Sequence, residues 1–337
     1  MPHIINIFKR ITQDYNDYHS HEWWCDGERG AVVSRDESNH TIIVKCHDVK
    51  HEIVASPVVF GESYDKQQIV YNVEANMECV QNDPILFPPS TKYASCTAIR
   101  GGGNRELLPQ WIEHHRLIGV EHFFVYVNEP LHEMDNLYPQ PYITYIPFDY
   151  EPKNPYYFQA TWQNDCIYRA KNASVTWVGI HDIDEYFEPM EEPYQIANVM
   201  DHYNPDKDVG ISVLNHWWGP HPDEPWTHEK AQILMDYVWR APSHFGPQKN
   251  IVSPKLVDYY YVHWVRGMKP EAHPLHIGQH VLRQIRMNHF RRPYTHVHDV
   301  EFPETLVKDT SFRDRYSDRV KAAIADGRSR NIVSATA

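Results

Sequence analysis

The sequence predicts an α/β fold, in which a mostly parallel sheet is flanked by helices, with a small N-terminal antiparallel β module. Strand-like and helix-like segments alternate between residues 93 and 180, a pattern typical of parallel sheets covered by helices. Residues 20–80 hold short apolar runs rich in β-branched residues, separated by turn residues, which favours antiparallel strands. A chain of 337 residues exceeds a typical single core, so we expect one large domain and one smaller domain.

The elements of the α/β part follow in order along the chain. Apolar residues at i, i+3, i+4 and i+7 predict a helix over 106–117, with Pro109 in its first turn and Gly119 at its end. The glycines at 101–103 predict a flexible turn, because no phosphate-binding fingerprint surrounds them. A second helix is expected over 158–170. Strands are expected at 93–99, 122–127, 142–148, 175–180, 209–215, 251–257 and 259–265.

Changes in composition set the expected domain boundaries. Residues 1–90 form the β-rich module, because the proline-rich stretch before residue 91 cannot continue a strand ladder. Residues 91–302 form the α/β domain. Residues 303–337 form a polar C-terminal tail with a short helix at 317–325.

Composition excludes some classes of function. Lys and Arg number 32 against 45 Asp and Glu, and the net charge of −13 argues against nucleic-acid or anionic-lipid partners. No window approaches the ~18 uninterrupted apolar residues that a membrane helix needs, and the N-terminus lacks a signal-peptide layout, so we expect a soluble chain as given. Aromatic residues reach 13%, which suits deep cores, interfaces or sugar stacking. The five cysteines include no CxxC pair and leave two alternatives open, buried thiols or one or two disulfides.

Three carboxylates follow the apolar strand at 175–180, namely Asp182, Asp184 and Glu185. Ligands of open α/β sheets bind beyond the carboxyl ends of strands. Carboxylates crowded there repel one another unless a cation lies between them. Oxygen ligands favour Mn²⁺ or Mg²⁺, and such an ion could hold a diphosphate. Glu185 is either an outer partner of this site or a surface charge.

The Asp-x-Asp triplet alone is weak evidence for a metal site. Chance gives roughly one or two such triplets in a chain of this composition, and two occur, at 182–184 and 206–208. Their positions differ, since 206–208 lies in a polar turn after Asn204-Pro205 and 182–184 ends an apolar strand. Position therefore favours 182–184.

Several spaced motifs accompany this triplet, and together they resemble glycosyltransferase family 92. The resemblance covers roughly residues 93–295. The motifs, in chain order, are Trp111-Ile112-Glu113-His114-His115 with Ile118-Gly119-Val120, then Gln159, Gln163 and Asp165-Cys166, then Thr176-Trp177-Val178 with Asp182-Ile183-Asp184-Glu185-Tyr186-Phe187, and His289-Phe290-Arg291-Arg292.

The resemblance implies a GT-A fold and a metal-dependent inverting transfer of a hexose, with UDP-galactose as the best-known donor class. It implies Mn²⁺ or Mg²⁺ held by Asp182, Asp184 and His289, with Asp182 also near the ribose. Arg100 and Asn128 match positions that line the nucleotide pocket. The implied partners are a UDP-sugar and a glycan or glycoprotein acceptor, and the implied location is the Golgi lumen of the secretory pathway.

Other polar residues carry weaker hypotheses. Inverting displacement needs a carboxylate base, and Asp223 and Glu224 are the candidates, although a solvated loop carboxylate is the simpler explanation for either one. Trp217 or Trp218 could stack on a sugar, and because adjacent strand residues point to opposite faces, at most one faces the site. The histidine-rich stretch 263–280 matches no zinc pattern. The helical pair His114 and His115 are expected to be packed in the core.

Two other classes of function remain open. One is a carbohydrate-binding protein of the same fold without turnover. The aromatic content favours it, as does the Asn128-Glu129 pair, which stands where the family commonly has Asp-Asn. The other is a metal-dependent phosphohydrolase, although no nucleophile motif is present.

Overall fold

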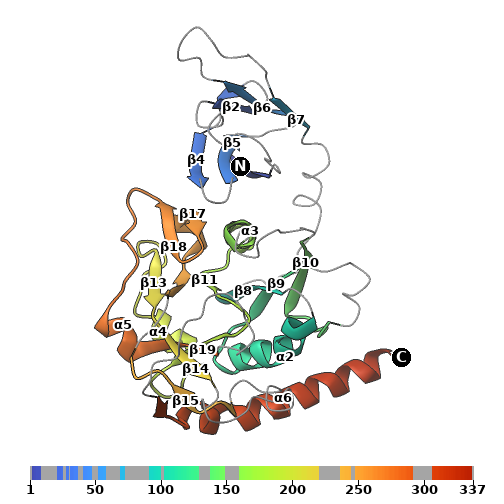
Figure 1. Cartoon of the computed structure of the whole chain (residues 1–337), viewed down its shortest axis with the longest axis vertical. Helices are drawn as coiled ribbons and strands as arrows, with labels where there is room; N and C mark the ends of the chain where they lie inside the picture. Colours follow the sequence, from blue (N-terminus) through green and yellow to red (C-terminus); the bar gives the residue numbers. More distant parts are fainter. Residues whose placement is uncertain are drawn as a thin grey trace. The chain divides into compact units, whose positions relative to one another are not determined.

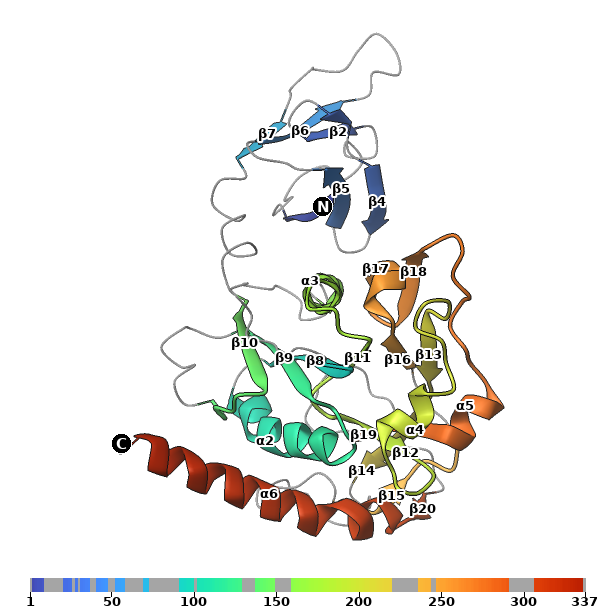
Figure 2. The same cartoon turned by 180° about the vertical axis from the view of Figure 1, so that it is seen from behind.

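The computed structural model divides the chain into two compact units, Met1–Leu86 and Phe87–Ala337 (Figures 1 and 2). In the first unit it describes the strands between residues 2 and 72. In the second it describes residues 91–99, 102–128, 137–148, 159–219, 236–243, 247–290 and 306–335.

The first unit contains two antiparallel sheets. One has the order β1 (Pro2–Phe8), β5 (Thr41–His47), β4 (Ala31–Asp36). The other has the order β3 (Glu28–Arg29), β2 (His21–Cys25), β6 (Glu52–Pro57), β7 (Ile69–Asn72). Every pairing in both sheets is antiparallel. The predicted antiparallel β module is therefore confirmed.

A six-stranded sheet is the centre of the second unit. Its order is β10 (Ile143–Pro147), β9 (His122–Val127), β8 (Tyr93–Ile99), β11 (Trp177–Ile180), β16 (Lys249–Val252), β13 (Gly210–Val213). The first four strands are parallel, and β16 runs antiparallel to both of its neighbours. The predicted α/β class with a mostly parallel sheet is thus confirmed, with an antiparallel strand inserted near one edge.

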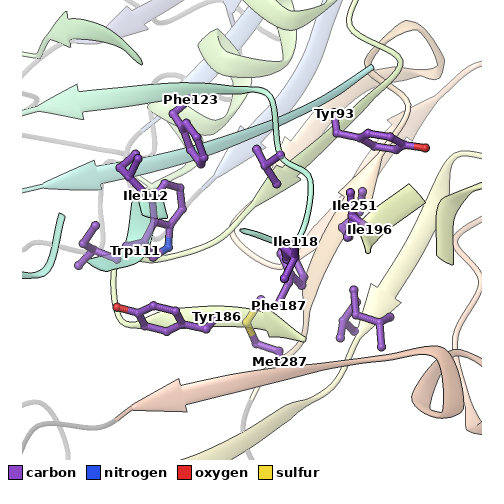
Figure 3. Close-up of a cluster of buried hydrophobic side chains, with 14 of the residues drawn as sticks. Tyr93, Trp111, Ile112, Ile118, Phe123, Tyr186, Phe187, Ile196, Ile251 and Met287 are labelled. Carbon is purple, nitrogen blue, oxygen red and sulfur yellow. The ribbon is translucent and has the colours of Figure 1, made fainter. Parts of the chain in front are cut away.

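Hydrophobic cores cover both faces of this sheet. Alternate residues of β9 enter different cores, Phe123 and Val125 on one face and Phe124 and Tyr126 on the other. Helix α2 (Gly102–Leu117) packs on the first face and α3 (Gln159–Asn172) on the second (Figure 2). Because both faces are buried, the parallel strands are almost continuously apolar. Figure 3 shows the first core, in which Trp111 of α2 lies beside Phe123.

A second sheet completes this unit. Its order is β12 (Glu185–Pro189), β19 (Ile285–Phe290), β14 (Asn215–Gly219), β15 (Trp239–Arg240), β20 (Val307–Lys308). The remaining elements are α4 (Ile196–Met200), the 3₁₀ helix η6 (Pro254–Leu256), the hairpin strands β17 (Val257–Tyr261) and β18 (Trp264–Met268), α5 (Gln279–Gln284) and α6 (Ser311–Ala335).

Several predicted elements have different bounds in the structure. Helix α2 begins at Gly102, inside the glycines predicted to form a turn, so Pro109 lies within the helix and not in its first turn. The strand predicted over 251–257 ends at Val252, because Pro254 starts a 3₁₀ helix. The strand predicted over 259–265 is a hairpin, with a turn between Tyr261 and Trp264. Gly119 ends α2 as predicted, with φ of 99°.

Helix α6 is longer than the short helix predicted at 317–325, and it packs on the second unit. Phe312, Tyr316 and Val320 lie in the same core as α2. Arg315 forms an ion pair with Glu188, a fully buried residue of β12. Residues 311–335 are therefore part of the α/β unit, which differs from the predicted boundary at residue 302.

One disulfide joins the central strand β8 to helix α3, between Cys96 and Cys166. Of the two alternatives for the cysteines, buried thiols or disulfides, the disulfide therefore holds for Cys96 and Cys166. Disulfides persist in oxidising compartments, which fits the secretory pathway implied by the family resemblance.

Removing this disulfide should destabilise the protein, because the bridge spans 70 residues of sequence and restricts the unfolded chain. Cys96→Ser with Cys166→Ser is expected to lower the free energy of unfolding by about 4 kcal/mol. Urea unfolding of the oxidised protein and of the double variant measures the difference. Equal midpoints would show that the bridge does not form in solution.

In the described part of the chain, no helix is long and apolar enough to cross a membrane.

Candidate functional site

The carboxyl ends of β8, β9 and β11 meet at one edge of the central sheet. Asn128 follows β9, and its backbone N–H donates to the carbonyl of Ile99 at the end of β8. Asp182 lies two residues beyond the end of β11. The Asp182–Glu185 turn is closed from both sides, since Glu185 N–H donates to the Asp182 carbonyl and Asp182 N–H donates to Glu185 Oε2 at 2.8 Å.

A buried lysine lies between two of the three carboxylates. Lys249 Nζ is 2.6 Å from Asp182 Oδ2 and 3.2 Å from Glu185 Oε2. Lys249 and Glu185 are each 1% exposed, and the side chain of Asp182 is 33% exposed. Lys249 is the first residue of β16, which pairs with β11 and brings it to the edge where Asp182 lies. The cation that crowded carboxylates require is therefore supplied, for two of them, by the fold itself.

The charges of this cluster shift one another's pKa values. Burial disfavours the ammonium of Lys249, but Asp182 and Glu185 outweigh this and raise its pKa. Burial would raise the pKa of Asp182, but the positive charge of Lys249 outweighs burial, so the pKa of Asp182 is lowered. For Glu185, burial prevails and the pKa is raised. The lysine thus stays charged and favours the ionised form of Asp182.

The third carboxylate faces a histidine. His289 Nε2 is 3.6 Å from Asp184 Oδ2, and His289 Nδ1 is 3.4 Å from Glu185 Oε1. Strand pairing aligns them, because His289 of β19 is the register partner of Glu185 on β12. The Phe290 N–H also donates to the Asp184 carbonyl at 2.9 Å. Burial alone would lower the pKa of His289, but the neighbouring carboxylates, Asp184 foremost, raise it.

Trp217 is the register partner of His289 on its other side, on β14. Paired residues of adjacent strands share a face of the sheet, so Trp217 lies on the same face as His289 and Glu185. Its ring is only 4% exposed. Trp218 points to the other face, where its Nε1 donates to Asn288 Oδ1 at 2.8 Å.

Helix α2 holds the main chain of β12 in place. The Trp111 indole N–H donates to the Glu185 carbonyl at 3.1 Å, and His114 Nε2 donates to the Phe187 carbonyl at 2.8 Å. His115 Nε2 accepts from the Phe187 N–H at 3.3 Å. The prediction that both histidines are packed in the core is confirmed, since both are fully buried. These motif residues support the carboxylate turn and lie behind it.

Helix α3 positions a different neighbour of the site. Asp165 accepts from Tyr126 and Arg169, and Cys166 forms the disulfide. Asn164 makes two hydrogen bonds to the backbone of Tyr260 in β17, and Gln163 donates to the carbonyl of Val262 in the following turn. The Gln-Asn-Asp-Cys stretch therefore links the central sheet to the β17–β18 hairpin.

The described side chains at this edge of the sheet offer few ligands to a divalent ion. Within the described ranges, no group of three or more His, Cys, Asp or Glu side chains is arranged to hold a metal ion by itself. Asp182 is paired with Lys249. Asp184 and His289 are 25% and 18% exposed, and His289 Nδ1 is buried and makes no hydrogen bond to any residue that the structure describes. A carboxylate oxygen suits Mn²⁺, and an imidazole nitrogen is a common ligand of first-row divalent ions, so these two residues fit a divalent ion whose other ligands come from a diphosphate.

Three predicted site residues, Arg100, Asp223 and Glu224, lie outside the described residues.

Two histidines of the stretch 263–280 contact the second Asp-x-Asp triplet. Asp208 accepts from His273 at 2.9 Å and from His276 at 3.2 Å. The second triplet is thus engaged in surface contacts, and Asp206 pairs with the exposed Lys255.

Sequence reasoning missed Lys249 and Asn215. Asn215 Nδ2 donates to Glu185 Oε1 at 3.3 Å. The sequence contained one signal, because Lys249-Asn250 begins an otherwise apolar strand and a charged residue there needs a partner. Of the two alternatives for Glu185, the surface charge is excluded by its burial.

A comparison with curated protein sequences returned no match. The family model for glycosyltransferase family 92 matches residues 93–331, which include the carboxylate turn, Lys249, His289 and most of α6. The match covers more than half of the chain and the mixed α/β architecture is of the glycosyltransferase type, so the chain belongs to glycosyltransferase family 92.

Proposed function

We propose that the protein is a metal-dependent, inverting glycosyltransferase that moves a hexose, with galactose as the first candidate, from a UDP-sugar to a hydroxyl of a glycan. Family membership supports glycosyl transfer in general. The observation that carries the finer proposal is the approach of Asp184 and His289 to 3.6 Å at the edge where the parallel strands end, which is where ligands of such sheets bind.

Asp184 and His289 would hold Mn²⁺ or Mg²⁺. When bound, the ion would neutralise the donor diphosphate as it leaves. Lys249 neutralises part of the charge of Asp182 and Glu185, so Asp184 and His289 are available to the ion. Asp182, one third exposed, and Asn128 would contact the nucleoside, together with Arg100.

The proposed reaction is a single displacement. The acceptor oxygen forms a bond to the anomeric carbon while the bond from that carbon to the β-phosphate oxygen breaks, and UDP leaves with the electron pair. The hydroxyl proton passes to a carboxylate base, for which Asp223 and Glu224 remain the candidates. Attack from the face opposite UDP inverts the anomeric configuration.

The two Asp-x-Asp triplets provide a matched experiment. Asp184→Asn is expected to lower the rate of UDP release from UDP-galactose about a hundredfold at saturating Mn²⁺. The metal ion would lose a carboxylate ligand and would neutralise the charge that develops on the diphosphate less well. Asp206→Asn, in the surface triplet, should leave the rate unchanged. A panel of UDP-hexoses with and without Mn²⁺ identifies the donor. Full activity of the Asp184 variant, or equal rates without metal, would contradict the metal assignment.

A carbohydrate-binding protein without turnover is the second candidate. The pairing of Asp182 with Lys249 favours it, since this carboxylate already has a cation. Calorimetry with UDP and Mn²⁺ separates the two: sugar binding without nucleotide binding would favour the second candidate.

A further inference from the structure

The turn of the β17–β18 hairpin has a strained backbone. Val262 has φ of 48°, and the His263 N–H donates to the Tyr261 carbonyl at 2.5 Å. This is a three-residue turn with a β-branched residue at positive φ, where β-branched side chains are strongly disfavoured. Strain of this kind persists only where surrounding contacts hold it, and it gathers at ligand sites.

Contacts from two elements hold the turn. Gln163 of α3 donates to the Val262 carbonyl at 3.2 Å, and Asn250 of β16 donates to the His263 carbonyl at 2.8 Å. Asn250 also donates to the hydroxyl of Tyr260 at 2.6 Å. The turn is therefore fixed at consecutive peptide groups.

The turn lies beside the carboxylate cluster. His263 Nδ1 donates to the carbonyl of Gln248, the residue before Lys249, at 3.0 Å. Burial lowers the pKa of His263 to about 4, and the charge of Lys249 acts in the same direction while Asp182 opposes it.

The outward face of β18 carries an exposed aromatic ring next to this histidine. Trp264 is 44% exposed and Met268 is 40% exposed, and Arg266 lies between them on the same face. Val265 packs on the core from the opposite face. Of the four large apolar side chains that are exposed in the described part, two lie on this strand.

We propose that the β17–β18 hairpin is the acceptor-binding element of the enzyme, with Trp264 as the platform on which a pyranose ring of the acceptor stacks. The inference rests on the proposed function. The aromatic face provides an apolar surface for the sugar C–H groups, and Arg266 supplies donors for its hydroxyls. The strained turn joins this platform to His263, whose ring donates to the carbonyl of the residue before Lys249, so an acceptor held there would lie on the side of the hairpin nearest the carboxylate cluster.

Trp264→Ala tests the platform. The variant is expected to raise the acceptor KM about tenfold, the loss of one aromatic stacking contact, while donor hydrolysis without acceptor stays unchanged. Trp264→Phe should recover part of the affinity. Ile277→Ala, at an exposed apolar residue away from the hairpin, is the matched control. An unchanged acceptor KM, or an equal loss of donor hydrolysis, would overturn the inference.

Sugar binding separates this inference from the proposed function. Saturation-transfer NMR with methyl β-galactoside and methyl β-glucoside should detect binding to the wild type that Trp264→Ala weakens, whether or not UDP is released from any donor. Absent UDP release would contradict the proposed function alone. Absent binding of both glycosides to the wild type, or equal binding to the variant, would overturn the hairpin assignment.

Discussion

Lowering the pH from 7.5 to 5.0 is expected to remove about 6 kcal/mol from the free energy of unfolding through His114, His122 and His181. His115 and His263, whose pKa values are also lowered, act in the same direction. Burial lowers the pKa of His114 and His122 to about 4 and that of His181 to about 3. In the unfolded chain each takes up a proton near pH 6.5. Each histidine therefore contributes about 2 kcal/mol of destabilisation at pH 5.

The direction of this dependence follows from the proton balance. Between pH 6.5 and about 4 the unfolded chain binds more protons than the folded chain, so stability is full above pH 6.5 and falls as the pH falls. His289, whose pKa is raised, acts in the opposite direction and offsets a part. Urea unfolding followed by tryptophan fluorescence measures the effect, and His114→Gln should flatten the pH dependence. A midpoint independent of pH would contradict the assignment of neutral buried histidines.

Lys249→Met is expected to lower the free energy of unfolding by about 3–5 kcal/mol, because it leaves the buried Glu185 and the neighbouring Asp182 without a cation. Lys249 and Glu185 are each 1% exposed, so water cannot replace the missing charge. Chemical denaturation at pH 7.5 measures the loss.

Two variants control this experiment. Lys255→Met removes an exposed ion pair with Asp206 and should change stability by less than about 1 kcal/mol. Lys249→Met combined with Glu185→Gln restores the net charge of the cluster and should recover part of the loss. Equal effects of Lys249→Met and Lys255→Met would show that the buried ion pair does not contribute.

Much of the central sheet could be predicted from the sequence, because strands buried on both faces are continuously apolar and end in recognisable turns. The strand predicted at 122–127 has those bounds in the structure. The sequence predicts the start of helix α2 four residues too late because glycine has weak helix propensity, whereas the helix begins at Gly102. The 259–265 segment looked like one strand because its turn residue is a valine, which sequence rules do not assign to positive φ.

The site could be predicted only in part. The position of Asp182 and Asp184 after a buried strand indicated where charge would gather, and the approach of His289 agrees with the family motif. Lys249 could not be assigned to the cluster because it lies 67 residues beyond Asp182, and only the antiparallel pairing of β16 with β11 brings them together. The sequence indicated that the crowded carboxylates need a cation. It did not reveal that Lys249 supplies this cation for Asp182 and Glu185.

Trp111, His114 and His115 of helix α2 form hydrogen bonds to peptide groups of β12. Hydrogen bonds to the main chain do not depend on which side chains the strand carries. All five residues of β12 are buried, so its side chains stay available to the other elements that pack on them, as Glu188 is to Arg286 and Arg315. A change in one of those partners can therefore alter the packing around the strand without releasing its main chain from α2.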